Sequence, residues 1–278
     1  MKLISINSGL FKLDGGAMFG VVPKKIWSKL ITPDTNNLCT WSMRCLLVDA
    51  GYRKILIDCG MGNKQDEKFF SHYEPHGEQL FESLNKNGYA SEDITDVFLT
   101  HLHFDHCGGA VAKTGDGKFI PAFPNAAYWS NKKQWDWATN PNSREKASFL
   151  KENFIPLLEQ GVLKFIKDET EEIIPGFKTI WVNGHTESMM LPVIQYNSKT
   201  IVYMADLMPS YAHIPIPYVM GYDVRPLITL KEKEEFLKEA VEKNYILFFE
   251  HDAEHECCDL QMTDKGIRPK DFFTIDSI

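Results

Sequence analysis

The chain has 278 residues and a formal net charge of −8, with acidic and basic side chains spread along its length. A nucleic-acid-binding protein would be expected to carry a basic stripe, and none is present, so we expect no nucleic-acid partner. No apolar run reaches the roughly 18 residues that a membrane-spanning helix needs, so we expect no membrane partner.

The cysteine pattern gives the expected redox state. Six cysteines are present without any C-x-x-C pair, and no secretory signal is recognisable at the start of the sequence. We therefore expect reduced thiols in a cytoplasmic protein rather than a disulfide framework.

The first half of the chain alternates short strands with a helix. Its predicted elements are strands at 46–48, 55–57 and 97–100 and a helix at 78–87. A hairpin turn at 49–52 joins the first two strands, and Gly88 is placed to end the helix. The strand at 97–100 leads directly into His101.

The second half repeats this pattern. Its predicted elements are helices at 144–160 and 230–244 and strands at 178–182, 191–196, 200–205 and 245–249. The charged run 231–235 is interpreted as the solvated face of a helix. Two sheet-forming halves with helices outside predict an α/β fold, a four-layer αββα sandwich, in a single domain spanning 1–278.

The run from His101 to His106 is dense in metal-binding side chains, with three histidines and one aspartate in six positions. On a loop leaving a strand, His101 and His103 can point to one side. Asp105 and His106 can then reach a second position about 3.5–4 Å away, the spacing of two-metal hydrolases. Imidazole and carboxylate ligands favour Zn²⁺, although Mn²⁺, Fe²⁺ and Co²⁺ also accept them. We therefore expect two divalent metal ions.

The remaining ligands are expected at the ends of downstream strands. His185, Asp206 and His251 each follow a predicted strand, and a carboxylate can bridge two ions through its two oxygens. The predicted arrangement is a first metal on His101, His103 and His185, a second metal on Asp105, His106 and His251, and Asp206 shared between them.

Each of these residues has a simpler interpretation. His185 alone would more often be a structural histidine, and Asp206 alone a turn or N-cap residue. His255 competes with His251, which is favoured because it directly follows an apolar strand. Asp58 is about equally consistent with a turn aspartate and with an acceptor that orients a ligand histidine.

The motif His101-x-His103-x-Asp105-His106, followed by His185, Asp206 and His251, resembles the metallo-β-lactamase superfamily in its dinuclear hydrolase form. The order and approximate spacing match from about residue 46 to residue 251. This resemblance implies the αββα fold. An aspartate at 206 in place of cysteine disfavours β-lactam hydrolysis, and a histidine at 103 in place of glutamate disfavours the diiron flavoprotein branch.

The stretch from Asp14 to Lys24, with Trp27, resembles the quorum-quenching N-acyl-homoserine-lactone lactonases, which are related to methyl parathion hydrolase. Those lactonases carry a tyrosine three residues after the bridging aspartate, and this chain has Pro209 there. A hydrogen bond to the substrate is then expected from another side chain. The expected substrate-binding residues are Phe19, Tyr211, His213 and Tyr218.

The resemblance implies that hydroxide held by the metals attacks a lactone or ester carbonyl, with Asp105 as the catalytic group that moves the proton. The expected partner is a small-molecule ester, lactone or phosphotriester, and a homodimer is left open. A phosphotriesterase like methyl parathion hydrolase and a thioesterase of the glyoxalase II type remain alternatives, because two metals serve acyl and phosphoryl centres alike. A metal-binding protein without activity is disfavoured by the seven candidate ligands.

Overall fold

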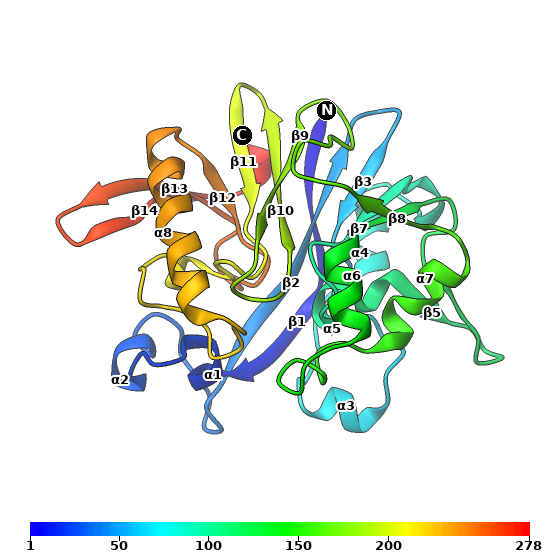
Figure 1. The fold of residues 1–278 in the computed structure, drawn as a ribbon, viewed down its shortest axis with the longest axis horizontal. Coiled ribbons are helices and arrows are strands. Elements are labelled where there is room, and N and C mark those ends of the chain that lie inside the picture. Colours follow the sequence, from blue (N-terminus) through cyan, green and yellow to red (C-terminus); the bar gives the residue numbers. More distant parts are fainter. The chain divides into compact units, whose positions relative to one another are not determined.

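The computed structural model describes residues 1–278, which fold into mixed α/β structure with two six-stranded sheets and one two-stranded sheet (Figure 1). The predicted α/β class is confirmed. The chain divides into two compact units: the first comprises Met1–Leu10 and Met43–Asp168, and the second Phe11–Ser42 and Glu169–Ile278.

The first six-stranded sheet has the order β1-β2-β3-β4-β7-β8, and β1 and β2 continue from the first unit into the second. Its strands are β1 (Lys2–Asp14), β2 (Leu38–Asp49), β3 (Lys54–Ile57), β4 (Asp96–Phe98), β7 (Ala127–Asn131) and β8 (Leu163–Ile166). The small sheet pairs β5 (Val111–Lys113) with β6 (Phe119–Pro121). The helices of this unit are α3 (Glu67–Ser71), α4 (Leu80–Lys86), α5 (Phe104–Cys107), α6 (Lys132–Thr139) and α7 (Ile155–Glu159), with short 3₁₀ turns η1 (Ser91–Asp93), η2 (Gly108–Ala110) and η3 (Lys151–Asn153).

The second unit contains a sheet of order β14-β13-β12-β11-β10-β9, with the long helix α8 running beside it (Figure 1). Its strands are β9 (Phe177–Val182), β10 (Met189–Tyr196), β11 (Lys199–Tyr203), β12 (Ile246–Phe248), β13 (Cys257–Thr263) and β14 (Gly266–Phe273). Its helices are α1 (Gly15–Phe19), α2 (Lys24–Trp27) and α8 (Pro226–Glu242), with 3₁₀ turns η4 (Tyr211–His213) and η5 (Ile275–Ser277).

Most predicted elements are confirmed within one to four residues. The β2–β3 hairpin closes with Asp49 opposite Lys54. Gly88 follows α4 with φ +83°, a left-handed conformation that favours glycine at a helix end. All six cysteines are buried. None of the helices is both long and apolar enough to cross a membrane.

The predicted helix over 144–160 is wrong. Only η3 and α7 are helical there, because Phe154 has φ −139° and Pro156, which lacks an N–H, lies in the first turn of α7. The stretch before them is held instead by a tertiary hydrogen bond and by local contacts of Asn142. The Phe104 amide donates to the Ser148 carbonyl over 3.0 Å, and Asn142 accepts from backbone amides two and three residues ahead.

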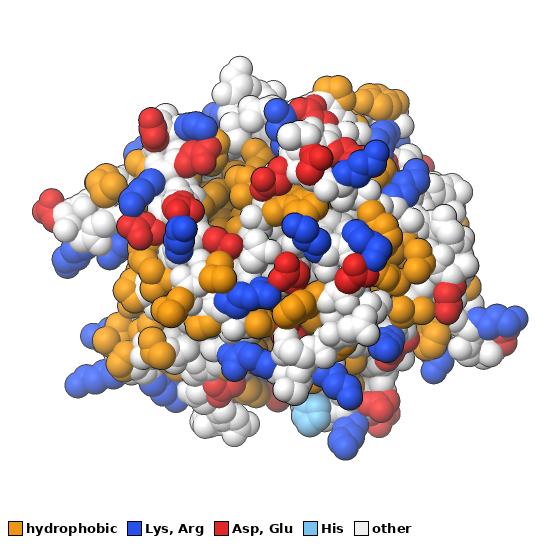
Figure 2. Space-filling model, viewed as in Figure 1, with side chains coloured by type: hydrophobic (Ala, Val, Ile, Leu, Met, Phe, Trp, Pro, Cys, Tyr) orange, Lys and Arg blue, Asp and Glu red, His pale blue; other side chains and the backbone are white.

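Charged side chains of both signs are interspersed over the face of the molecule drawn in Figure 2. On α8, Lys231 with Glu235 and Lys238 with Glu234 form exposed ion pairs one helical turn apart, as expected of a solvated face. Lys233, in the same charged run, is an exception. Its side chain is fully buried, so the solvated interpretation is wrong at this position.

Candidate metal centre

The ligand motif of the first unit begins at an edge where two parallel strands end. β3 and β4 are paired in parallel, so Asp58 and Thr100 follow neighbouring strands at the same edge. Asp58 accepts the Thr100 amide at 2.8 Å and the Thr100 hydroxyl at 2.6 Å. Asp58 therefore anchors the chain just before His101, which favours the orienting role over a simple turn aspartate.

The same anchor fixes the tautomers of two histidines. Because the Thr100 hydroxyl donates to Asp58, it accepts from Nδ1–H of His101 at 3.1 Å. Nδ1–H of His106 donates to Asp58 at 3.1 Å. In both rings Nε2 is then the unprotonated nitrogen, the form that binds a metal.

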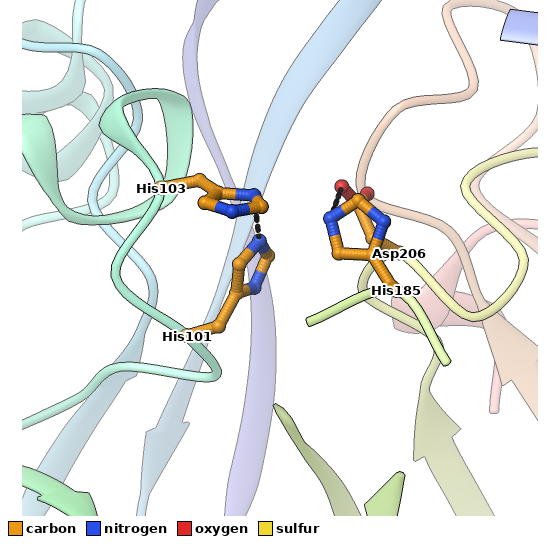
Figure 3. Close-up of side chains that lie close together, drawn as sticks. All are labelled: His101, His103, His185 and Asp206. Carbon is orange, nitrogen blue, oxygen red and sulfur yellow. Dashed lines mark hydrogen bonds and ion pairs between the residues drawn. The ribbon is translucent and has the colours of Figure 1, made fainter. Parts of the chain in front are cut away.

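In His103 the outer partner faces Nε2, whereas in His101 and His106 it faces Nδ1. Its Nδ1 lies 3.1 Å from Nε2 of His101 (Figure 3), and its Nε2 lies 3.6 Å from a carboxylate oxygen of the buried Glu145. The other Glu145 oxygen accepts from the Trp137 indole N–H at 2.6 Å and from the Asn142 amide at 2.7 Å. This carboxylate favours a proton on Nε2 and leaves Nδ1 of His103 to bind a metal.

Asp105 is the remaining predicted ligand of this unit, and one of its carboxylate oxygens lies 3.9 Å from Nε2 of His106. Gly108 follows with an ordinary helical φ of −58°, so its backbone conformation does not by itself require glycine. A Cβ on Gly108 would lie 2.0 Å from the Met61 carbonyl oxygen. Glycine is required here because the loop at 59–61 packs directly against the motif.

The second unit supplies the other predicted ligands from strand ends. β11 and β12 are paired in parallel, so Asp206 and His251 follow neighbouring strands at one edge. His185 comes three residues after β9. The glycine before it packs against α8, where a Cβ on Gly184 would lie 2.2 Å from the Thr229 hydroxyl.

The carboxylate of Asp206 contacts both predicted ligand histidines of this unit. Asp206 has one oxygen 2.9 Å from Nε2 of His185 (Figure 3) and the other 3.1 Å from Nε2 of His251. On their far sides, Nδ1–H of His185 donates to Asp223 at 2.9 Å and Nδ1–H of His251 donates to the Ser42 carbonyl at 2.7 Å. Both histidines therefore present Nε2 toward the same aspartate.

This arrangement affects the protonation of the metal-free protein. Burial lowers the pKa of His185, but the carboxylates of Asp206 and Asp223 outweigh burial and raise it to about 10. In the absence of metal, His185 is a cation paired with two carboxylates at neutral pH. A metal ion that binds Nε2 must displace this proton.

The donor set in both units fits divalent transition metals. All five histidines have an outer partner at one ring nitrogen and present the other toward a neighbouring ligand residue. Imidazole with carboxylate is the ligand chemistry of zinc, manganese, iron and cobalt sites. Of the outer partners, the sequence indicated only Asp58, and it gave no signal for Glu145, Asp223 or Ser42.

The four expected substrate-binding residues lie in the second unit. Phe19 is fully buried, with its ring stacked on Trp27 at 5.2 Å and on His213 at 4.7 Å between centroids. Both nitrogens of His213 are engaged, Nδ1 with the Ser210 hydroxyl and Nε2 with the Met18 carbonyl. Such a ring supports the neighbouring segment instead of offering a donor to a substrate.

The two tyrosines differ in their contacts. The Tyr211 hydroxyl donates to the Leu30 carbonyl at 3.1 Å, so it is also engaged within the protein. The half-buried Tyr218 meets the ring of Phe19 edge-on at 6.2 Å. Of the four residues, only Tyr218 has a side-chain polar group, its hydroxyl, that makes no hydrogen bond within the protein.

An aromatic cluster that sequence reasoning missed lies beside Asp105 in the first unit. Phe104, within the motif, contacts Phe69 at 5.2 Å and Tyr73 at 4.6 Å between ring centroids. Burial, followed by the negative charge of Asp105, raises the pKa of Tyr73 to about 12. The ligand loop is thus bordered by apolar rings, with Tyr73 remaining protonated at neutral pH.

Comparison with known families identifies the chain. The model of the metallo-beta-lactamase superfamily matches residues 44–251, which include all seven predicted ligands. The chain belongs to this superfamily. The resemblance expected from the motif is therefore confirmed, together with the fold class.

Several individual proteins of known description are similar to this chain. An N-acyl homoserine lactonase of Bacillus thuringiensis is 26% identical over 235 residues, covering 79% of this chain and 84% of the relative. A solved structure described as a probable metal-dependent hydrolase from Staphylococcus aureus is 27% identical, with a TM-score of 0.89 and coverage of 98% and 96% of the two chains. AidC, a dizinc quorum-quenching lactonase in complex with a product, is 23% identical with a TM-score of 0.81 and coverage of 98% and 95%, and at that identity it shows the fold alone. The chain is a metal-dependent hydrolase of this superfamily.

Proposed function

We propose that this enzyme holds two divalent metal ions and hydrolyses the lactone ring of N-acyl-homoserine lactones or related cyclic esters. In this proposal residues 1–278 form one metallo-β-lactamase-like domain. The proposed ligands are His101, His103 and His185 for one ion, Asp105, His106 and His251 for the other, and Asp206 for both.

The arrangement around Asp206 carries the dinuclear part of this proposal. Its two oxygens face different histidines, and each of these presents Nε2 because its Nδ1 is held from behind. A carboxylate whose two oxygens face different ligand histidines can bind one ion through each oxygen, which supports Asp206 as the shared ligand.

Two metals of this kind, when bound, supply a Lewis acid and an activated water at neutral pH. The protein's own groups orient the ligands and move the proton. Asp58, Glu145 and Asp223 keep the ligand histidines in the required tautomers. Asp105, one of the less enclosed ligands with an 11% exposed side chain, is the proposed group that carries the proton to the leaving alkoxide.

The lactone assignment rests on the relatives and on the surroundings of Asp105. Lactonases of Bacillus match most of this chain, and the rings of Phe69, Tyr73 and Phe104 offer apolar surface suited to an acyl chain. Pro209 departs from the lactonase pattern. Its carbonyl accepts the His251 amide at 3.1 Å, so this position supports a ligand through the backbone.

The first prediction concerns substrate preference. We expect kcat/KM for hexanoyl-homoserine lactone to exceed the values for paraoxon and for S-lactoylglutathione by at least about tenfold. The measurement uses one preparation loaded in turn with zinc, manganese, iron or cobalt, and we expect zinc to support activity. Metal-free protein is the control. A clear preference for paraoxon or S-lactoylglutathione would replace the lactonase proposal with a phosphotriesterase or a thioesterase.

A second prediction concerns Glu145. In Glu145→Gln, the amide oxygen must take the place of the carboxylate oxygen that accepts from Trp137 and Asn142. The amide NH₂ then faces Nε2–H of His103, so that two donors oppose each other. We expect metal affinity to fall by about tenfold to a hundredfold, measured by competition with a chelator at fixed pH. Glu159→Gln, at an exposed position in the same unit, is the matched control. Unchanged affinity would show that Glu145 does not orient His103.

We extend the proposal to the setting of the enzyme. The substrate is a small molecule, with no nucleic-acid or membrane partner, and the protein is cytoplasmic with its thiols reduced. Mass measurement in solution would decide the question of a homodimer.

A further inference from the structure

His185 lies in the loop 183–188, which joins β9 to β10 beyond the last paired residues of those strands. The first two amides of this loop therefore have no partner in the sheet, and one side chain of α8 accepts both. The Asn183 amide donates to one carboxylate oxygen of Glu232 at 2.7 Å, and the Gly184 amide donates to the other at 3.0 Å. Because an ionised carboxylate has two acceptor oxygens, Glu232 holds both peptide groups that precede His185.

Arg225, the residue immediately before α8, holds the other side of the same loop. Its guanidinium donates to the Asn183 carbonyl at 2.7 Å and to the Glu187 carboxylate at 2.8 Å, and its own amide donates to the Gly184 carbonyl at 2.8 Å. The loop is thus held at its amides by Glu232 and at its carbonyls by Arg225.

The imidazole ring of His185 is held from the same segment of the chain. Its Nδ1–H donates to Asp223 at 2.9 Å, and the His185 carbonyl accepts from the Val224 amide at 3.1 Å. Residues 223–232 therefore contact both the backbone of the loop and the ring of the ligand. Because Nε2 of His185 lies only 2.9 Å from Asp206, a shift of the loop on α8 would displace the nitrogen that is proposed to bind metal.

Packing alone does not require a carboxylate at position 232. The side chain of Glu232 is half-buried, whereas Glu234 and Glu235 of the same charged run are exposed. Burial raises the pKa of Glu232, and the hydrogen bonds from the two loop amides oppose that effect. A methionine of similar length has no charge to bury, but it offers no acceptor to the amides. The distinctive contribution of the carboxylate is therefore to hold the loop.

We propose that Glu232 is a positioning residue that fixes the 183–188 loop and thereby sets the affinity with which His185 binds a metal ion. The inference rests on the proposed ligand role of His185. Glu232 is not itself a ligand, and it acts through the backbone of the loop. The glycine at 184 fits this role, because a side chain there would separate the loop from α8.

The test measures metal affinity in Glu232→Gln by competition with a chelator at fixed pH. Glutamine has the shape of glutamate but only one acceptor oxygen, and its NH₂ would face a backbone N–H that needs an acceptor. We expect the affinity for at least one ion to fall by about tenfold to a hundredfold, while circular dichroism shows a folded protein. Glu235→Gln, at an exposed position on the same helix, is the matched control and should bind metal like the unmodified protein.

A double variant shows whether Glu232 acts through His185. His185→Gln should itself weaken metal binding, and adding Glu232→Gln should weaken it no further, because the loop then carries no ligand to position. If the two losses add, Glu232 affects metal binding by another route and the proposal is wrong. Unchanged affinity in Glu232→Gln alone would overturn it as well.

Amide hydrogen exchange of the metal-free proteins provides a readout that depends neither on metal nor on activity. Exchange across 183–188 should be about tenfold faster in Glu232→Gln than in the unmodified protein, and unchanged in Glu235→Gln. Equal exchange in Glu232→Gln and the unmodified protein would show that Glu232 does not hold the loop. If His185→Gln binds metal as tightly as the unmodified protein, the proposed ligand set fails and the effect on metal affinity with it, while exchange still decides whether Glu232 holds the loop.

Discussion

Asp206→Ala is expected to lose at least one metal ion and nearly all hydrolytic activity, at least about a thousandfold in kcat/KM, while the fold is retained. The carboxylate has one oxygen toward His185 and the other toward His251. Alanine removes the shared ligand of both proposed metals together. It also removes one of the two carboxylates that stabilise the protonated form of His185 in the metal-free protein.

The expected result separates metal loss from unfolding. Metal content per chain is measured by elemental analysis after dialysis, and folding by circular dichroism and thermal melting. Asp264→Ala, at an exposed turn of the same unit, is the matched control and should retain two ions and full activity. Full metal content in Asp206→Ala would show that this carboxylate is not the bridge.

The sequence could single out His185, Asp206 and His251 as candidate ligands because each follows a predicted strand. Parallel pairing of β3 with β4 and of β11 with β12 brings the ends of neighbouring strands to one edge. Asp206 and His251 thereby become neighbours although 45 positions separate them in the chain. Local patterns of apolar residues were sufficient to place both.

The outer partners could not be predicted in the same way. Glu145 lies in the stretch that the apolar spacing assigned to a helix, where Asn142 and the Phe104 amide impose a different backbone. Lys233 sits in an alternating charged run typical of a solvated helix face. Its burial depends on the carbonyls of the 215–218 turn, whose position no local pattern encodes.

The expected substrate residues show a related limit. Residue type and a family resemblance suggest Phe19 and His213 as substrate-binding residues, whereas their contacts are with each other, with the Ser210 hydroxyl and with the Met18 carbonyl. The type of a residue can suggest that an aromatic ring lies near the predicted metal site. Only the hydrogen bonds reveal whether its polar atoms remain available to a substrate or are used to hold a loop in place.

His213 also leads to a large expected effect of pH on stability. Its pKa is about 3 in the folded protein, because of burial, and about 6.5 when unfolded. Below pH 6.5 the unfolded chain takes up a proton that the folded protein does not, so falling pH favours unfolding. This destabilisation by His213 is absent above about pH 6.5. As the pH falls toward 3, it lowers the free energy of unfolding by up to about 1.4 kcal/mol per pH unit.

The measurement is the free energy of unfolding of metal-free protein, by urea titration, at intervals between pH 7 and pH 4. His213→Gln retains an acceptor for Ser210 and a donor for the Met18 carbonyl but does not titrate. The free energy of unfolding of this variant should fall less steeply with falling pH than that of the unmodified protein. The difference in slope should correspond to about one proton, because the other groups titrate equally in both proteins. His72→Gln, at an exposed position, is the control and should follow the unmodified protein. Equal slopes for His213→Gln and the unmodified protein would show that His213 is protonated in the folded state, and that its two hydrogen bonds are not those of a neutral ring.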